Sequence, residues 1–165
     1  MFLCPFYLIN LGFGLSDRYE RCGRLDDLEE AIRVYQQAVN ATPPDSPDRP
    51  SYLNNLGAGL IARYARSGQL EDLEEAIRLN QQAVDYTLPD SPDRPKFLNN
   101  LGNVLRDRYA HNGRIEDLRE AQDCYRTACV LGEQQALEIM LAAGRNWSHW
   151  AFERQAWKEA VEAFD

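Results

Sequence analysis

The sequence has no excess of positive charge. Its 165 residues include 18 Lys and Arg against 26 Asp and Glu, a formal net charge of −8 at pH 7. Proteins that bind nucleic acids usually carry a basic patch or stripe, so this composition argues against a nucleic-acid partner. Charged residues make up 27% of the chain and apolar residues 44%, which is typical of a folded globular protein.

Histidine and cysteine are scarce, and neither is placed for chemistry. His111 and His149 have no Cys or Asp at a motif spacing, so we predict no metal site, no cofactor and no Cys–His dyad. Disulfide frameworks are typical of short secreted chains with dense cysteine. We therefore predict free thiols and a reducing, cytoplasmic location. The four cysteines, which include no Cys-x-x-Cys pair, are Cys4, Cys22, Cys124 and Cys129.

Long apolar runs are also absent. No stretch approaches the roughly 18 apolar residues of a membrane-spanning helix, so we expect no membrane partner. The apolar start of the chain, Met1–Leu15, resembles a signal peptide, but it lacks a basic segment and a small-residue cleavage site. We interpret it as the first helix of the repeat described next.

What the sequence does contain is a repeat of 45 residues. Of the 45 positions in Phe6–Pro50, 31 are identical in Ser51–Pro95, and a third copy starts at Lys96. A fixed period of 20 to 50 residues is typical of solenoid proteins. We predict one array over residues 1–165, with repeats at 6–50, 51–95 and 96–132 and a partial repeat at 133–165.

Each repeat predicts two helices, which we call A and B. In helix A the spacing of Leu8, Leu11, Leu15 and Tyr19 predicts one buried face. Glycines inside helix A recur in each copy, and we expect a close approach of backbone there that leaves no room for a Cβ. These glycines are Gly12, Gly57 and Gly102.

Helix A is predicted to end at a left-handed glycine, which is Gly23 in the first copy. Asp27-x-x-Glu30, repeated in the other copies, predicts a capping box that starts helix B. We expect acids in this first turn to complement the helix dipole. Arg18, Arg63 and Arg108 are expected to pair with these acids or to pack against nearby tyrosines.

The connections between repeats differ along the chain. All eight prolines lie in the joints or just before the first repeat, and we interpret Thr42–Pro50 and Thr87–Pro95 as rigid joints. Cys129–Gly132 is predicted to be a third joint, without proline, followed by a helix over 134–154 and part of another at 156–164. This end has no polar cap, so we infer a fragment, a truncated product or a part of a larger assembly.

These residues resemble the tetratricopeptide repeat (TPR) family. Its helix B pattern of Ala, aromatic and Ala matches Ala31/Tyr35/Ala38 and Ala121/Tyr125/Ala128, whereas Asn80 replaces the aromatic residue in the second copy. The long repeats are similar to those of kinesin light chains. The motifs Asp-Leu-Glu-Glu-Ala-Ile and Pro-Asp-Ser-Pro-Asp-Arg-Pro resemble arrays that precede caspase-like CHAT domains.

The resemblance implies that helices A line a concave face that binds an extended peptide. An asparagine amide both donates and accepts hydrogen bonds, so a ladder of Asn10, Asn55 and Asn100 could hold a peptide backbone. Alternatively, the asparagines bond neighbouring helix ends or one another. Some TPR domains bind the C-terminus of a chaperone with lysines and an arginine beside asparagines, an arrangement called a carboxylate clamp. We do not expect one here, because Ile9 and Phe13 stand where the clamp has a lysine and an asparagine, and Asn100 stands where it has the arginine. The predicted binding residues are Asn10, Phe13, Asn54, Asn55, Ile61, Asn99, Asn100, Asn103 and Arg106.

The sequence therefore predicts an all-α, right-handed α-solenoid of antiparallel helix pairs, with seven full helices and part of an eighth. We expect a non-catalytic protein-interaction module that binds a protein, peptide or partner helix in its concave groove. The alternative is a regulatory or assembly segment of a larger CHAT protease-like protein, packed against an adjacent C-terminal domain. An enzyme is the least favoured interpretation, because no catalytic constellation is found.

Overall fold

A computed structural model describes residues 4–135, 143–146 and 148–149. The predicted helices over 134–154 and 156–164, with Trp147, Trp150 and Trp157, lie mostly outside this range. The main helices are α1 (Pro5–Cys22), α2 (Leu25–Ala41), α3 (Arg49–Ser67), α4 (Leu70–Asp85), α5 (Arg94–Asn112) and α6 (Ile115–Gln135). The described residues contain helices and no strands, which confirms the predicted all-α fold.

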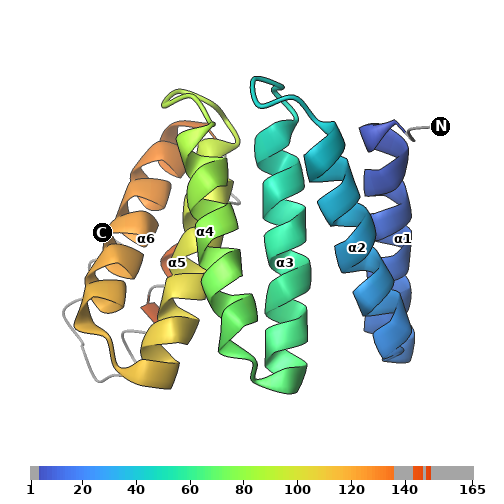
Figure 1. Ribbon diagram of the computed structural model, residues 1–165. Helices are drawn as coiled ribbons and strands as arrows, with labels where there is room; N and C mark the ends of the chain where they lie inside the picture. Colours follow the sequence, from blue (N-terminus) through green and yellow to red (C-terminus); the bar gives the residue numbers. More distant parts are fainter. Residues whose placement is uncertain (1–3, 136–142, 147, 150–165) are drawn as a thin grey trace. The chain divides into compact units, whose positions relative to one another are not determined.

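The chain forms two compact units, residues 1–86 and 87–165. In the first unit, α1 packs against α2, α2 against α3, and α3 against α4 (Figure 1). In the second unit, α5 packs against α6. Each of the first three predicted repeats thus contributes one helix A–helix B pair, the arrangement expected of an α-solenoid.

The turn inside each pair is made by the predicted glycine. Gly23, Gly68 and Gly113 have φ angles of 68°, 70° and 70°, in the left-handed region that favours glycine. Each glycine N–H donates to the carbonyl oxygen of a tyrosine four residues earlier, at 2.7 to 2.8 Å. This contact satisfies a terminal carbonyl of helix A and ends the helix, as predicted.

The start of helix B is not a capping box, and this prediction was wrong. The residue before α2 is Arg24, without a side-chain cap, and Asp27 lies in the first turn. The buried Asp27 carboxylate instead accepts two hydrogen bonds from Arg18, at 2.7 and 2.5 Å. In a capping box the Asp27 carboxylate would accept a hydrogen bond from the backbone at the start of the helix. Here it binds Arg18, nine residues earlier in the chain, instead.

The same pair recurs in the other two repeats. Arg63 donates to Asp72 at 2.8 and 2.6 Å, and Arg108 donates to Asp117 at 2.7 and 2.6 Å. Two parallel N–H···O bonds match the planar guanidinium to the carboxylate and fix their relative orientation. The expected pairing of these arginines with first-turn acids is confirmed.

Helices A and B approach closely at the repeated glycine of helix A. A Cβ at Gly12 would overlap the ring of Tyr35, and a Cβ at Gly102 would lie 2.7 Å from Cε1 of Tyr125. The predicted lack of room for a Cβ is confirmed, but a side chain fills the space and not a backbone. Each glycine therefore accommodates the aromatic residue of helix B.

The second repeat fills this space with an amide. Asn80 is 1% exposed, its Nδ2 donates to the carbonyl oxygen of Ala76 at 2.8 Å, and its Oδ1 has no hydrogen-bond partner among the described residues. A Cβ at Gly57 would lie 2.7 Å from Nδ2 of Asn80. The substitution of the aromatic residue thus leaves the pair formed but buries an unsatisfied polar atom, which is unfavourable.

The predicted buried face of helix A holds in α3 and needs correction in α1. Leu8 and Leu15 are buried in α1, as Leu53 and Leu60 are in α3. Leu11 was also predicted to be buried, but it is 49% exposed. The equivalent residue Leu56 is 1% exposed on α3, which packs against both α2 and α4, whereas α1 packs against α2 at the edge of the first unit (Figure 1). Sequence periodicity alone does not distinguish these two situations.

An arginine stiffens the first proline joint. Nη1 of Arg49 donates to the carbonyl oxygens of Val39 and Thr42, at 3.1 and 2.6 Å. The guanidinium also lies 5.9 Å from the ring centroid of Tyr86, within range of a cation–π interaction. In the second unit Arg94 repeats the contact with Thr87, at 2.6 Å. These contacts support the interpretation of the joints as ordered.

The predicted third joint at Cys129–Gly132 does not exist. Helix α6 runs through these residues to Gln135. A proline removes a backbone N–H and ends a helix, and this segment has none. A single glycine, Gly132, lowers helix propensity by about 1 kcal/mol, which is too little to end a helix that packs along α5.

Two alanine substitutions in α1 test the glycine contact. We expect Gly12→Ala to lower the free energy of unfolding by about 1–3 kcal/mol, because the methyl group overlaps Tyr35. Gly14→Ala is the matched control, since nothing lies within 4 Å of its Cβ position, and it should raise stability by about 1 kcal/mol. Urea unfolding measures both, and equal effects would contradict the assigned packing.

The Arg18–Asp27 pair predicts a pH-dependent contribution to stability. The hydrogen bonds from Arg18 hold the pKa of Asp27 below its ordinary value of 3.8. The ionised carboxylate therefore stabilises the fold above that value, and the contribution is lost as the pH falls through the lowered pKa.

We expect Asp27→Asn to be less stable than wild type near neutral pH. The difference in unfolding free energy should shrink in acid, measured by urea unfolding across that range. Asp45→Asn, at an exposed joint residue, provides the control. A difference for Asp27→Asn that does not change with pH would exclude this ionic role.

Candidate functional site

The predicted binding residues of the first unit lie on two sides of helix A. Asn10 and Phe13 are exposed on α1, and Phe13 is 51% exposed while its ring lies edge-on to Tyr35, with centroids 6.1 Å apart. In α3 the equivalent positions are Asn55, which is half-buried, and the exposed Ala58. These four residues, Asn10, Phe13, Asn55 and Ala58, form what we call the A row.

Two other predicted residues of this unit are less accessible. Asn54 is 6% exposed, so almost none of its surface is available to a ligand in this structure. Ile61 is half-buried on α3. Neither belongs to the A row, because their positions in α3 are turned toward the packed side of the helix.

In the second unit, two predicted asparagines make hydrogen bonds within the protein. Asn103 accepts a hydrogen bond from the hydroxyl of Tyr125 at 2.8 Å. Asn99 accepts one from Nδ2 of Asn146 at 3.2 Å. The side chains of Asn99 and Asn103 are thus engaged within the second unit. Asn100 is half-buried, and Arg106 is half-buried and forms an ion pair with Asp107 at 2.8 Å.

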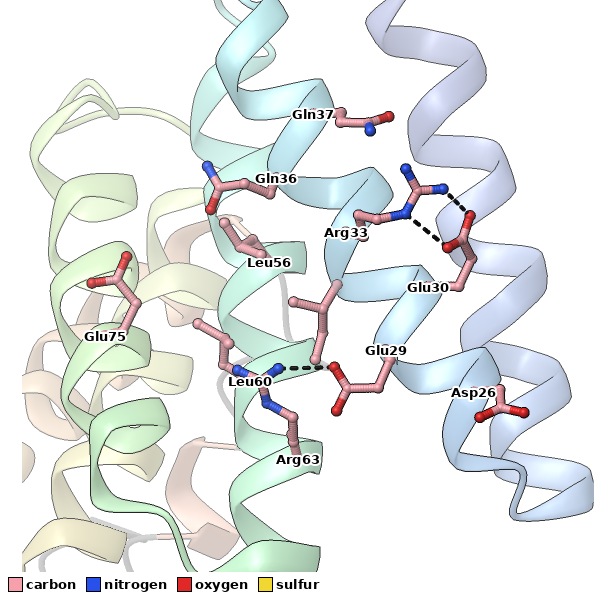
Figure 2. A pocket seen from close by; sticks show the side chains of 11 residues that line it. Asp26, Glu29, Glu30, Arg33, Gln36, Gln37, Leu56, Leu60, Arg63 and Glu75 are labelled. Atoms are coloured by element: carbon pink, nitrogen blue, oxygen red, sulfur yellow. Dashed lines mark hydrogen bonds and ion pairs between the residues drawn. The ribbon is translucent and has the colours of Figure 1, made fainter.

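The first unit also contains a pocket that was not predicted. It has a volume of about 700 Å³ and lies between α2, α3 and α4 (Figure 2). Ile32, Leu56 and Leu60 supply its apolar lining, while Gln36 and Gln37 lie along α2. Its other lining residues are Asp26, Glu29, Glu30, Arg33, Arg63 and Glu75.

Ion pairs organise the charged part of this pocket. Nη1 of Arg63 donates to Glu29 on α2 at 2.9 Å, while its other nitrogens hold Asp72. Hydrogen bonds to Asp72 and then to Glu29 raise the pKa of Arg63, so its guanidinium stays charged. Arg33 pairs with Glu30 (Figure 2). With four carboxylates and two guanidiniums, the lining is net negative.

A signal for this pocket is present in the sequence. The pair Gln36-Gln37 recurs as Gln81-Gln82, although neither Gln36 nor Gln37 is buried. The packing of the core does not explain why two repeats share residues that are not buried. The acids of the first turn were assigned only to the helix dipole, and their pairing with Arg63 from the next repeat was not considered.

The cysteines differ strongly in environment. None of the four forms a disulfide; Cys4 and Cys22 are exposed, Cys129 is half-buried and Cys124 is buried. Burial raises the pKa of Cys124 to about 12, and burial also raises the pKa of Cys129. The thiolate is the reactive form of cysteine, so neither is prepared to act as a nucleophile.

The described part of the chain offers few other sites. Within it, no group of three or more His, Cys, Asp or Glu residues is placed to hold a metal ion. None of its helices combines the length and the apolar character needed to cross a membrane.

The family follows from comparison with known repeats. A family model described as tetratricopeptide repeat matches residues 7–48, 51–93 and 97–130. The matches span well over half of the chain, which therefore belongs to the tetratricopeptide repeat family. Repeats of this family generally mediate protein–protein interactions, and their proteins are typically scaffolds and not enzymes. No curated protein shows a significant match to the chain.

Solved structures support the fold. The chain is similar to a protein titled DHF79 filament, with a TM-score of 0.53 and 16% identity over 96% of this chain and 81% of that chain. It is also similar to the de novo designed helical repeat protein DHR64, with a TM-score of 0.51 and 17% identity over 96% and 89%. At such identities the likeness concerns the fold alone.

Thiol labelling provides a direct check of these environments. We expect iodoacetamide to modify Cys4 and Cys22 readily at mildly alkaline pH. Cys124 should be protected until the protein is unfolded, because it is buried and its pKa is about 12. Mass spectrometry of tryptic peptides identifies the modified residues. Rapid labelling of Cys124 in the folded chain would contradict the packing of α6 on α5.

Proposed function

We propose that this chain is a non-catalytic protein-interaction module that binds a peptide or a partner helix along the A row of the first unit. The observation that supports this most directly is Phe13, which remains 51% exposed although its ring contacts Tyr35. An aromatic ring held in place by a buried tyrosine loses little side-chain freedom when a ligand covers it. Aromatic residues are also enriched among the residues that dominate binding energy.

The polar part of the A row complements this apolar contact. Asn10 lies one turn before Phe13, and Asn55 occupies the equivalent position on α3. Amide side chains donate and accept hydrogen bonds, so both can pair with the backbone of an extended peptide. Ala58, which occupies the position of Phe13 in the second repeat, has a small side chain. The proposed ligand therefore has an apolar side chain for Phe13 and an accessible backbone for the asparagines.

An alternative function is a regulatory or assembly segment beside a CHAT protease-like domain. The likeness of the Asp-Leu-Glu-Glu-Ala-Ile and proline-joint motifs to such arrays supports it. Under this function the isolated chain binds no library peptide, and a CHAT domain supplied separately binds it instead. We also propose a cytoplasmic location, because cysteines outside disulfides are typical of a reducing compartment.

A displayed random-peptide library tests the main proposal. We expect the full chain to select peptides with an apolar anchor, and Phe13→Ala with Asn55→Ala to weaken binding by about tenfold or more, which is about 1.4 kcal/mol. Both positions reach the surface, so the fold should be retained, as circular dichroism can verify.

The matched control is Gln36→Ala with Gln37→Ala, which changes the pocket between α2, α3 and α4 and leaves the A row intact. Loss of binding in this control alone would move the site to the pocket. The absence of any selected peptide would argue against peptide binding by this chain and leave the CHAT alternative for testing.

A further inference from the structure

The pocket between α2, α3 and α4 is elongated along α2. Its lining residues on that helix run from Asp26 to Gln37, which is about 16 Å at a rise of about 1.5 Å per residue. An extended peptide advances about 3.3 Å per residue. The pocket therefore has the length of about five extended residues, which suits a short segment of chain better than a single side chain.

Apolar side chains form the floor of the pocket, and carboxylates stand at its sides. Ile32 on α2 and Leu60 on α3 belong to the lining and are 8% and 5% exposed, so the floor is narrow. In Figure 2, Glu29 on α2 and Glu75 on α4 lie on either side of Leu60. Such a floor suits the methylene stem of a long side chain, and the carboxylates suit a cationic head.

The helix dipole explains only one of the four carboxylates of the lining. Asp26 lies in the first turn of α2, where a negative charge complements the dipole, but this effect falls off beyond the first turn. Glu29 and Glu30 lie in the second turn of α2, and Glu75 lies in the second turn of α4. The dipole therefore does not account for these three acids.

The arginines of the first unit neutralise this acidic end incompletely. Nε and Nη2 of Arg63 hold the buried Asp72, and its Nη1 also pairs with Glu29, so one guanidinium serves two carboxylates. Asp26 makes no hydrogen bond or ion pair with any described residue. The other two acids of the lining each pair with an arginine of their own helix. A surplus of negative charge therefore remains at this end of the pocket.

We propose that this pocket binds a short, extended, basic segment of a separate partner protein. An arginine or lysine of the segment lays its stem on Ile32 and Leu60. Its cationic head pairs with Asp26 and with the second oxygen of Glu29. Gln36, farther along α2, supplies an amide that can bond to the backbone of the segment.

Charge favours a separate partner over a second copy of this chain. The chain has a formal net charge of −8, so two copies repel each other. A partner segment with surplus positive charge is attracted to the same surface, and opposite potentials also speed its association.

This site is separate from the A row and does not rest on the function proposed for that row. On α3 the pocket uses Leu56, Leu60 and Arg63, which share one side of the helix. Ala58 of the A row lies two residues from each leucine, and such positions do not face each other. The A row takes an apolar side chain and the pocket takes a cation, so either proposal can fail without the other.

The test uses the full chain and a labelled five-residue peptide with arginine at its second and fourth positions and alanine elsewhere. Alternate residues of an extended chain point to the same side, so both arginines can face the pocket. By fluorescence anisotropy we expect this peptide to bind. A peptide with citrulline in place of both arginines has nearly the same shape without the charge and should bind at least about tenfold more weakly.

Two double variants distinguish the pocket from the acidity of the whole chain. Asp26→Asn with Glu75→Gln removes two carboxylates of the lining and should weaken binding by about tenfold or more. Asp45→Asn with Glu20→Gln removes one Asp and one Glu outside the lining and should retain most of the affinity. All four positions reach the surface, so the fold should be retained, as circular dichroism can verify.

Several outcomes would overturn the proposal. An equal loss in the two double variants would show that the peptide responds to net charge and not to the pocket. Equal affinity for the arginine and citrulline peptides would exclude recognition of a cation, and no binding of the arginine peptide would exclude the basic segment. Phe13→Ala with Asn55→Ala should leave binding unchanged, and a loss there would assign the peptide to the A row.

Sedimentation of the chain alone checks the remaining occupant. We expect no self-association that depends on the pocket. A dimer that Asp26→Asn with Glu75→Gln dissociates would identify a second copy as the occupant and exclude the separate partner.

Discussion

The pairing of an arginine with an aspartate nine residues later organises each helix pair. In all three repeats the guanidinium makes two hydrogen bonds to a carboxylate that is almost fully buried. Breaking such a pair leaves a buried charge without a partner, which costs far more than an exposed ion pair contributes. Together with the left-handed glycine of the turn, the pair fixes the direction of helix B, and this direction brings Tyr35, Asn80 or Tyr125 against the glycine of helix A.

Much of this fold was predictable from periodic residues. The turn glycines, the proline joints and the two helices of each repeat all follow from local rules that act within one repeat. The errors concern choices between partners. Asp27 could cap a helix or bind Arg18, and the bidentate partner is preferred over the helix end. Leu11 has the spacing of a core residue, but it is 49% exposed, whereas the equivalent residues Leu56 and Leu101 are buried.

The candidate site was predicted only in part for a similar reason. Asn10 and Asn55, which are one repeat apart, were predicted to lie on the same face of helix A. Phe13 was predicted to be a binding residue of that face. The pocket between α2, α3 and α4 depends on residues from three helices, and its central ion pair joins Glu29 and Arg63, which are 34 residues apart. A repeat considered by itself contains no information on such a contact, because each half belongs to a different copy.

The arginine of the proline joint has a consequence for how this protein can be divided. The carbonyl groups of Val39 in α2 and of Thr42, the residue that follows α2, accept hydrogen bonds from Arg49, which is the first residue of the following helix. The donor that completes α2 therefore lies inside the 6–50 repeat but outside the A–B helix pair itself. Anyone who excises, duplicates or recombines these repeats should cut after this arginine, since a module that ends with α2 loses the hydrogen-bond donor that completes its final helix.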